Sequence, residues 1–265
     1  MARFFYFVSL VFSYLLAALQ VYVIERDNRH FIAKFDRISL CAITMGTYKH
    51  KEDRIMANVL VIGASGQIGN QVTGKLLEAG HHVKAPVRSP DKFSDINDAN
   101  LTVIEQDLEE DFSSHFNNID VVVFTAGSGG NTGADKTIMI DLWAARNAIN
   151  YAKEAKVPKF VMVSSIGADD PDAIESPIKP YLVAKHMADE HLINSGLHHI
   201  ILRPGTLLNE PGTHLVSTEM PTNRSDAVIP REDVATAIVE SVNHAGSENI
   251  VTHLFKGATP ISNAF

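Results

Sequence analysis

The feature that most restricts the fold of this chain is a glycine-rich loop that directly follows a short apolar run. Residues 59–62 read Val-Leu-Val-Ile, and the loop reads Gly63-Ala-Ser-Gly66-Gln-Ile-Gly69. In such a loop the first glycine permits a tight turn, the second lets the backbone approach a pyrophosphate, and the third lets a helix pack on the strand. Residues 71–79 then have helical spacing. The pattern predicts a strand, a phosphate-binding turn and a helix whose N-terminal amides and dipole favour an anion.

The rest of the chain repeats this alternation of strand and helix. Apolar or β-branched runs predict five further strands, and most of these are apolar throughout, as in a parallel sheet that is covered on both faces. Residues 136–155 carry apolar side chains at steps of three and four from Ile138 onward, which predicts a long amphipathic helix. The expected strands are 59–62, 82–87, 101–104, 121–124, 160–163 and 199–202, and the expected helices are 71–79, 136–155, 180–195 and 231–244. The sequence therefore predicts an α/β doubly wound parallel sheet, the NAD(P)-binding Rossmann fold, with a small C-terminal substrate-covering segment after residue 203.

The nucleotide that such a loop would bind is indicated by the end of the second strand. That strand ends Val87-Arg88 and carries no acid for ribose hydroxyls, whereas the planar guanidinium of Arg88 suits a 2′-phosphate. This favours NADP over NAD, with a solvated arginine at a strand end as the alternative. Asp107 either accepts a hydrogen bond from the adenine amino group or is a turn residue. The candidate cofactor-binding residues are Gly63, Ser65, Gly66, Gln67, Ile68, Gly69, Arg88, Asp107, Leu108, Ala126, Gly127 and Lys185.

A candidate catalytic group follows the fifth expected strand. Tyr181 and Lys185 are four residues apart in an expected helix and so project from one face. A lysine cation beside a phenol lowers the phenol pKa from about 10 toward the working range of an acid–base catalyst. Ser164 and Ser165 end the strand, where an open α/β sheet presents its ligands, and one of these hydroxyls would orient a substrate carbonyl. A tyrosine and lysine on a helix surface are the alternative interpretation.

Together these motifs resemble the atypical short-chain dehydrogenase/reductases. The residues that carry the resemblance are Gly63-x-x-Gly66-x-x-Gly69, Val87-Arg88, the segment 160–169, Tyr181-Leu-Val-Ala-Lys185 and Leu202-Arg-Pro-Gly205. More narrowly, the chain is similar to the NAD(P)H-binding group related to biliverdin reductase B and NmrA-like proteins, over residues 56 to about 245. The resemblance implies NADP binding and an active site of Ser165, Tyr181 and Lys185. It also adds Asp141 to the catalytic candidates, because relatives carry an asparagine at that place in the long helix, and an acid there puts a relayed proton path in doubt.

Two functions from different classes are compatible with these residues. The first is an NADP-dependent oxidoreductase that transfers hydride to or from a small carbonyl or hydroxyl substrate, or an epimerase that uses hydride transfer transiently. The second is a non-catalytic NADP(H)-binding redox sensor of the NmrA kind. The formal net charge of −8 argues against a nucleic-acid partner. The 12 histidines lack ligand spacing, so no metal site is expected.

The first 55 residues are a different kind of sequence. Residues 4–24 contain no charged side chain and are long enough to cross a bilayer as a helix. Basic residues gather after this segment at Arg26, Arg29, Lys34 and Arg37, which would keep the domain on the cytoplasmic side, with residues 25–55 as a linker. Alternatively, Met56 is the initiator and residues 1–55 come from an upstream start. In that case the sequence predicts a cytoplasmic protein. If residues 1–55 are translated, Cys41 is the single cysteine and no internal disulfide can form, which fits a reducing compartment.

Overall fold

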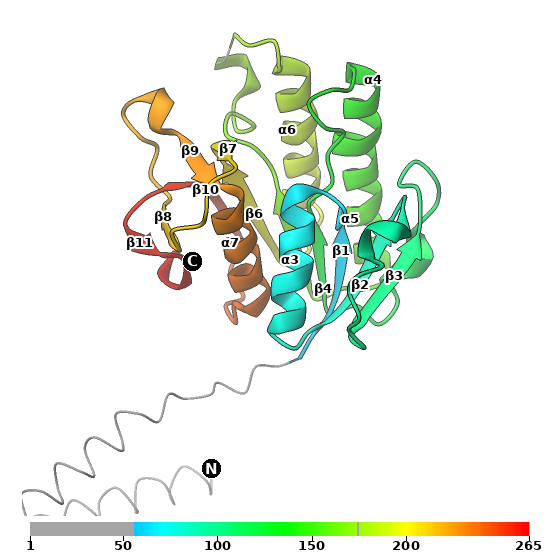
Figure 1. Ribbon diagram of the computed structural model, residues 1–265. Coiled ribbons are helices and arrows are strands. Elements are labelled where there is room, and N and C mark those ends of the chain that lie inside the picture. The colour runs from blue at the N-terminus through cyan, green and yellow to red at the C-terminus, as the bar shows by residue number, and fades with distance from the viewer. Residues whose placement is uncertain (1–55, 174, 265) are drawn as a thin grey trace, which may run out of the picture. The chain divides into compact units, whose positions relative to one another are not determined.

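The computed structural model describes residues 56–173 and 175–264 of the chain, drawn in colour in Figure 1. The expected membrane segment at residues 4–24 and the expected linker at 25–55 lie outside these residues. Among the helices of the described residues, none is both long enough and apolar enough to cross a membrane.

A mostly parallel sheet forms the centre of the domain and confirms the expected fold class. Its nine strands have the order β11-β8-β10-β6-β5-β4-β1-β2-β3. The strands from β10 to β3 in this order pair in parallel, whereas β8 is antiparallel to β10 and β11. The strands are β1 Asn58–Ile62, β2 His82–Val87, β3 Leu101–Glu105, β4 Val121–Phe124, β5 Lys159–Val163, β6 His199–Pro204, β8 Leu215–Ser217, β10 Ile250–Lys256 and β11 Thr259–Pro260. Strands β7 Thr206–Leu208 and β9 Val228–Pro230 pair separately.

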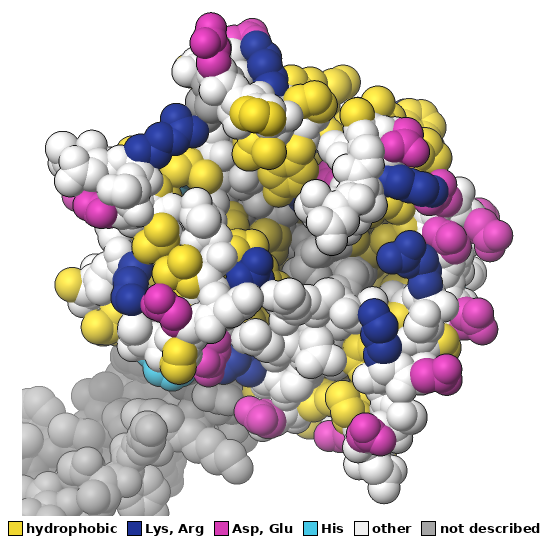
Figure 2. Space-filling view, turned by 45° about the horizontal axis from the view of Figure 1, so that its top comes forward, with side chains coloured by type: hydrophobic (Ala, Val, Ile, Leu, Met, Phe, Trp, Pro, Cys, Tyr) yellow, Lys and Arg dark blue, Asp and Glu magenta, His cyan; other side chains and the backbone are white. Residues whose placement is uncertain are grey.

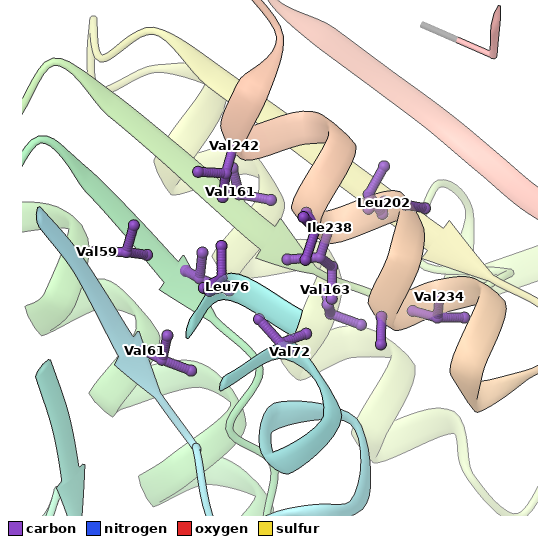
Figure 3. Close-up of a cluster of buried hydrophobic side chains, with 14 of the residues drawn as sticks. Val59, Val61, Val72, Leu76, Val161, Val163, Leu202, Val234, Ile238 and Val242 are labelled. Atoms are coloured by element: carbon purple, nitrogen blue, oxygen red, sulfur yellow. The ribbon is translucent and has the colours of Figure 1, made fainter. Parts of the chain in front are cut away.

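Helices cover both faces of the sheet, so the strands are buried on both sides (Figure 1). Helix α3 Gln67–Glu78 packs beside α7 Arg231–Asn243 on one face, and α5 Ala145–Glu154 packs beside α6 Lys179–Ile193 on the other. Alternate residues of each strand enter opposite cores. In β1, for example, Val59 and Val61 face α3 and α7 (Figure 3), whereas Leu60 and Ile62 face the other layer. This explains why the central strands are apolar at nearly every position.

The long helix expected at residues 136–155 differs in its first half. It consists of a short α4 Ala134–Lys136, a π-helical segment η3 Thr137–Ala144, and α5. A π-helix has more residues per turn than an α-helix, so its side chains change phase relative to the α-helical pattern. Ile138, which the sequence placed on the apolar face, is 54% exposed, while Asp141 is 1% exposed. That assignment of Ile138 was wrong because the expected spacing was α-helical. Such π-helical segments often occur at functional sites.

The C-terminal segment contains more regular structure than the sequence indicated. The helix expected at 231–244 is confirmed as α7, and the five strands from β7 to β11 were not predicted. Four of them have only two or three residues, which is too short for a periodic pattern. Strands β10, β8 and β11 extend the sheet beyond β6, and β7 and β9 form the separate pair.

Candidate active site

The glycine loop between β1 and α3 packs tightly against the start of the loop that follows β4. Gly63 has a φ of +90°, and a Cβ atom there would lie 2.5 Å from the backbone nitrogen of Ala126. A Cβ on Gly69 would overlap the carbonyl oxygen of Gly63. The first and third glycines are therefore required by backbone conformation and by close approach. The loop holds the N-terminus of α3 at the carboxyl end of the sheet.

The N-terminus of α3 is free to bind an anion. Gly66 occupies the N-cap position, and no side chain caps the helix. The amide of Gly66 donates to the carbonyl oxygen of Gly63 over 3.0 Å, but the first amides of a helix have no acceptor within the helix itself. These donors and the helix dipole favour a phosphate at this point. The residues present thus fit the pyrophosphate of a dinucleotide.

A cavity of about 400 Å³ opens beside this helix terminus. In Figure 2 this face of the molecule is hollowed, and Lys and Arg side chains lie around the hollow. Eight of the candidate cofactor-binding residues line the cavity, and Gln67, Ile68, Gly69 and Lys185 do not. The lining residues are Gly63, Ser65, Gly66, Pro86, Val87, Arg88, Lys92, Gln106, Asp107, Leu108, Glu109, Thr125, Ala126, Gly127, Ser128, Thr132, Lys136 and Ile140. The cavity collects loop ends from β1, β2, β3 and β4, as expected for the adenosine half of a dinucleotide site.

Basic side chains give this cavity a positive wall. Arg88 follows β2, and Lys92 lies in the next 3₁₀ turn, η1 Pro90–Phe93. Within residues 56–173 and 175–264, neither side chain has an ion-pair or hydrogen-bond partner. Both therefore remain available for an anionic ligand.

A third cation of the cavity, Lys136, is paired with an acid. Its Nζ donates to Oε1 of Glu109 over 2.5 Å, which raises the pKa of Lys136. Since Glu109 follows β3 and Lys136 belongs to α4, this pair joins two loops at the cavity wall.

The structure shows a turn role for Asp107 and a packing role for Ile68. Asp107 Oδ1 accepts a hydrogen bond from the amide of Glu109 over 3.0 Å, as in an Asx turn, and the exposed side chain also lines the cavity. The two interpretations of Asp107 are therefore compatible. Ile68 packs against the core that faces α3 and α7, while Gln67 is exposed.

Tyr181 and Lys185 lie in the first two turns of α6, beside the carboxyl end of β5. Tyr181 is half-buried, and the Nζ of Lys185 lies 5.8 Å from the centre of its ring. Lys185 is buried and donates to the carbonyl oxygen of Val163, the last residue of β5, over 3.1 Å. This hydrogen bond ties α6 to the strand end that carries the two serines.

The two serines have different surroundings. Ser164 is 3% exposed, and its hydroxyl donates to Asp189 Oδ2 over 2.9 Å. Ser165 is half-buried, and its hydroxyl donates to the carbonyl oxygen of the next residue, Ile166, over 3.2 Å. Because the Ser164 hydroxyl is engaged inside the protein, Ser165 is the stronger candidate for orienting a carbonyl.

Asp141 connects Lys185 with the loop that follows β4. Its Oδ2 accepts a hydrogen bond from the amide of Ser128 over 3.0 Å, and its Oδ1 lies 3.5 Å from Lys185 Nζ. Both side chains are nearly inaccessible, at 1% and 6% exposure. Burial lowers the pKa of Lys185, but the charges of Tyr181 and Asp141 outweigh it, and the net shift of this pKa is upward. Asp141 therefore favours the cationic form of Lys185 in the absence of a ligand.

Several residues of this region escaped the sequence reasoning. Lys92 and the Glu109–Lys136 pair had no local signal, since their partners or surroundings come from distant segments. Asp189 could have been found, because it continues the spacing of Tyr181 and Lys185 by another four residues. No group of histidine, cysteine and acidic side chains suited to a metal ion occurs in the described part of the chain.

Comparison with known proteins gives the same assignment for the domain. Residues 63–245 match the family described as NAD(P)H-binding. A Bacillus subtilis protein named uncharacterized sugar epimerase YhfK is 39% identical over 210 residues, which cover 78% of this chain and 97% of that protein.

Solved structures agree with this match. A protein of Bacillus halodurans, described as a candidate NAD-dependent epimerase/dehydratase, is 40% identical with a TM-score of 0.72, over 78% of this chain and 97% of its own. The oxidoreductase ylbE of Lactococcus lactis is 25% identical with a TM-score of 0.70, over 78% of this chain and 94% of its own.

Proposed function

The chain belongs to the NAD(P)H-binding family, and from this premise we propose that it is an NADP-dependent oxidoreductase of the atypical short-chain dehydrogenase/reductase type. Its reaction is hydride transfer to or from a small carbonyl or hydroxyl substrate. In an epimerase, hydride would leave one carbon of the substrate and return to the same carbon from the opposite side, so the cofactor would be changed only transiently. The names of the two Bacillus relatives favour including sugar-like hydroxyl compounds among the substrates to be tested.

The observation that carries the proposal is the anchoring of Lys185 at the end of β5. Lys185 donates to Val163 O over 3.1 Å, so Tyr181, one turn earlier on α6, is held beside the strand end that carries Ser165. A bound nicotinamide cofactor would supply or accept the hydride. Ser165 would orient the substrate oxygen by a hydrogen bond, and the Tyr181 hydroxyl would give that oxygen its proton or remove it. The Lys185 cation would stabilise the negative charge that develops on the Tyr181 oxygen as its proton is transferred.

Arg88 and Lys92 support NADP as the cofactor. The 2′-phosphate carries charge close to −2 near neutral pH, and an arginine fork binds such a group through charge-assisted hydrogen bonds. Both cations line the adenosine cavity without partners among the described residues, so no existing ion pair would have to break. No acid ends β2 to bind the two ribose hydroxyls of NAD.

The experiment is NADPH oxidation by the full chain against a panel of aldehydes, ketones, flavin-like acceptors and sugar nucleotides. Tyr181→Phe should lower turnover by about 10²- to 10⁴-fold and leave the Kd for NADPH within about twofold, because only the proton donor is lost. Tyr151→Phe is the matched control, since Tyr151 packs against Phe112 and Phe116 away from the cavity. Turnover by Tyr181→Phe equal to that of the unmodified chain would refute the mechanism.

A second candidate, an NADP(H)-binding redox sensor, is favoured by one specific observation. The cavity is lined by candidate cofactor-binding residues and by none of Ser165, Tyr181 and Lys185. A sensor would bind NADPH and NADP tightly, turn over no member of the panel and bind a partner protein in one redox form only. Any substrate with turnover that depends on Tyr181 rejects this alternative.

A further inference from the structure

A third residue shares the face of α6 that carries Tyr181 and Lys185. Asp189 follows Lys185 by four residues, so the three side chains lie along one stripe of the helix. The stripe becomes more buried along the helix: Tyr181 is half-buried, Lys185 is 5% exposed and Asp189 is 1% exposed. An acidic side chain is seldom buried to this degree unless it is paired.

Asp189 joins α6 to the carboxyl ends of two strands. Its Oδ2 accepts hydrogen bonds from the Ser164 hydroxyl, directly after β5, and from Arg203 Nε on β6, each over 2.9 Å. Its Oδ1 is buried and has no hydrogen-bond partner within residues 56–173 and 175–264. Oδ2 of Asp189 thus anchors α6 to the two strands, while the negative charge on Oδ1 is not neutralised by a hydrogen bond from the described residues.

We propose that Asp189 is a positioning residue for Lys185, which fixes this face of α6 against β5 and β6 and, together with Asp141, keeps the buried Lys185 in its cationic form. The role of Asp189 in hydride transfer rests on the proposed function. The effect of Asp189 on the charge of Lys185 does not rest on it, because this effect is a property of the protein without cofactor.

Charge balance explains why Asp141 alone is insufficient to keep Lys185 in its cationic form. The groups facing Lys185 are Tyr181 on its own helix, Asp141 on η3 and Asp189, and Arg203 on β6 faces Asp189 from the other side. With both acids ionised, the buried Lys185 and the partly buried Arg203 meet two buried anions. Without Asp189, Lys185 and Arg203 would share only Asp141, which lies 3.5 Å from Lys185 and forms no hydrogen bond with it. Burial would then favour loss of the Lys185 proton.

The direction of the pKa shifts agrees with this arrangement. Burial raises the pKa of Asp189, against the opposing effects of Ser164, Arg203 and Lys185. The Asp189 charge in turn helps to raise the pKa of Lys185. The ionised carboxylate of Asp189 is the form that stabilises the lysine cation.

The direct test follows the Lys185 ammonium by the chemical shift of its side-chain nitrogen in the full chain, labelled with ¹⁵N and free of cofactor. Its resonance is assigned by its disappearance in Lys185→Met. We expect the cation to persist beyond the ordinary lysine pKa of 10.5. In Asp189→Asn the midpoint should fall by about one to two pH units, the effect of removing a charge about 6 Å away in a medium of effective dielectric constant about 20. An unchanged midpoint overturns the proposal.

Two controls separate the Asp189 charge from the packing of the helix. Ser164→Ala removes one hydrogen bond to Asp189 but no charge, so the Lys185 midpoint should stay within a few tenths of a pH unit. A shift as large as that of Asp189→Asn would contradict a role through charge. If Asp189→Asn does not fold because Arg203 loses its partner, the comparison is made between Arg203→Gln and the double variant Asp189→Asn/Arg203→Gln. Only the double variant should show the lower midpoint.

The kinetic consequence is tested separately. With any substrate found for the enzyme, the alkaline limb of the kcat profile should move to lower pH in Asp189→Asn by the same amount as the Lys185 midpoint, and the conservative Asp189→Glu should restore most of this shift. Absence of turnover in the unmodified chain would refute the proposed function, while the Lys185 titration would still decide the role of Asp189.

Discussion

The exposed arginine after β2 allows a quantitative test of cofactor selection. Arg88→Met keeps the length and apolar part of the side chain but removes the guanidinium. Arg88 lines the cavity and has no partner among the described residues, so its loss leaves no other buried group unpaired. The predicted effect is therefore confined to the bound nucleotide.

The magnitude follows from the type of contact and its exposure. A hydrogen bond to a charged group contributes about 1.5–3 kcal/mol, equivalent to about ten- to hundredfold in Kd. Because Arg88 is exposed and Lys92 remains, we expect the lower end, about tenfold weaker binding of NADPH. NADH lacks the 2′-phosphate, so its Kd should change by less than about twofold.

The assay is calorimetric titration of the full chain with NADPH and with NADH at two salt concentrations. Salt should weaken NADPH binding more in the unmodified chain than in Arg88→Met, because screening acts on the charge that the variant lacks. Lys153→Met is the control, since Lys153 is exposed in the last turn of α5, which leads into the amino end of β5, whereas the cavity lies at the carboxyl ends of the strands. An equal loss for NADPH and NADH, or no loss for either, would refute the assignment of Arg88 to the 2′-phosphate.

Three further predictions concern the loops of the site and the stability of the fold. Gly69→Ala should lower the free energy of unfolding in urea by about 1–3 kcal/mol and abolish nucleotide binding, because the new Cβ overlaps the Gly63 carbonyl; unchanged stability and affinity would contradict this packing. Lys136→Met and Glu109→Gln should each speed dissociation of NADPH and of NADH by about two- to fivefold in stopped-flow measurements, since the ion pair joins two loops of the cavity beside α3. An effect on NADPH alone would argue for direct contact with the 2′-phosphate. Burial lowers the pKa of His199 below its usual 6.5, so the contribution of the neutral imidazole to the free energy of unfolding is complete above about pH 6.5 and is lost as the pH falls through the pKa of the folded state. His199→Gln should flatten this loss of stability on the acid side, and a profile of stability against pH identical to that of the unmodified chain would exclude His199 as its source.

The parts of the fold that were predicted from the sequence are those with a local physical cause. Burial on both faces requires apolar residues throughout β4 and after the first residue of β1 and of β5, and this pattern is readable within four or five residues. The glycine loop is equally local, since Gly63 and Gly69 are required by turns and contacts at one helix terminus. The helical spacing of Tyr181 and Lys185 placed both on one face of α6.

The parts that were not predicted depend on which segments meet after folding. The π-helical phase that buries Asp141 and exposes Ile138 is absent from any α-helical pattern. Four of the strands after β6 are too short to have a period of their own, and β8 and β11 join the sheet only through the pairing of β10 with β6.

The sequence by itself determined that this chain folds around a nucleotide-binding turn, because that turn needs glycines within seven consecutive residues. Only the tertiary structure decided which charges share the site. Glu109 meets Lys136 across 27 residues, and Ser164 meets Asp189 across 25. Such pairs are set by the sheet order and helix packing, since neither member has a sequence neighbour that would indicate the other. The glycine loop thus indicated that a phosphate would bind, while packing brought Asp141 to Lys185 and Ser164 to Asp189.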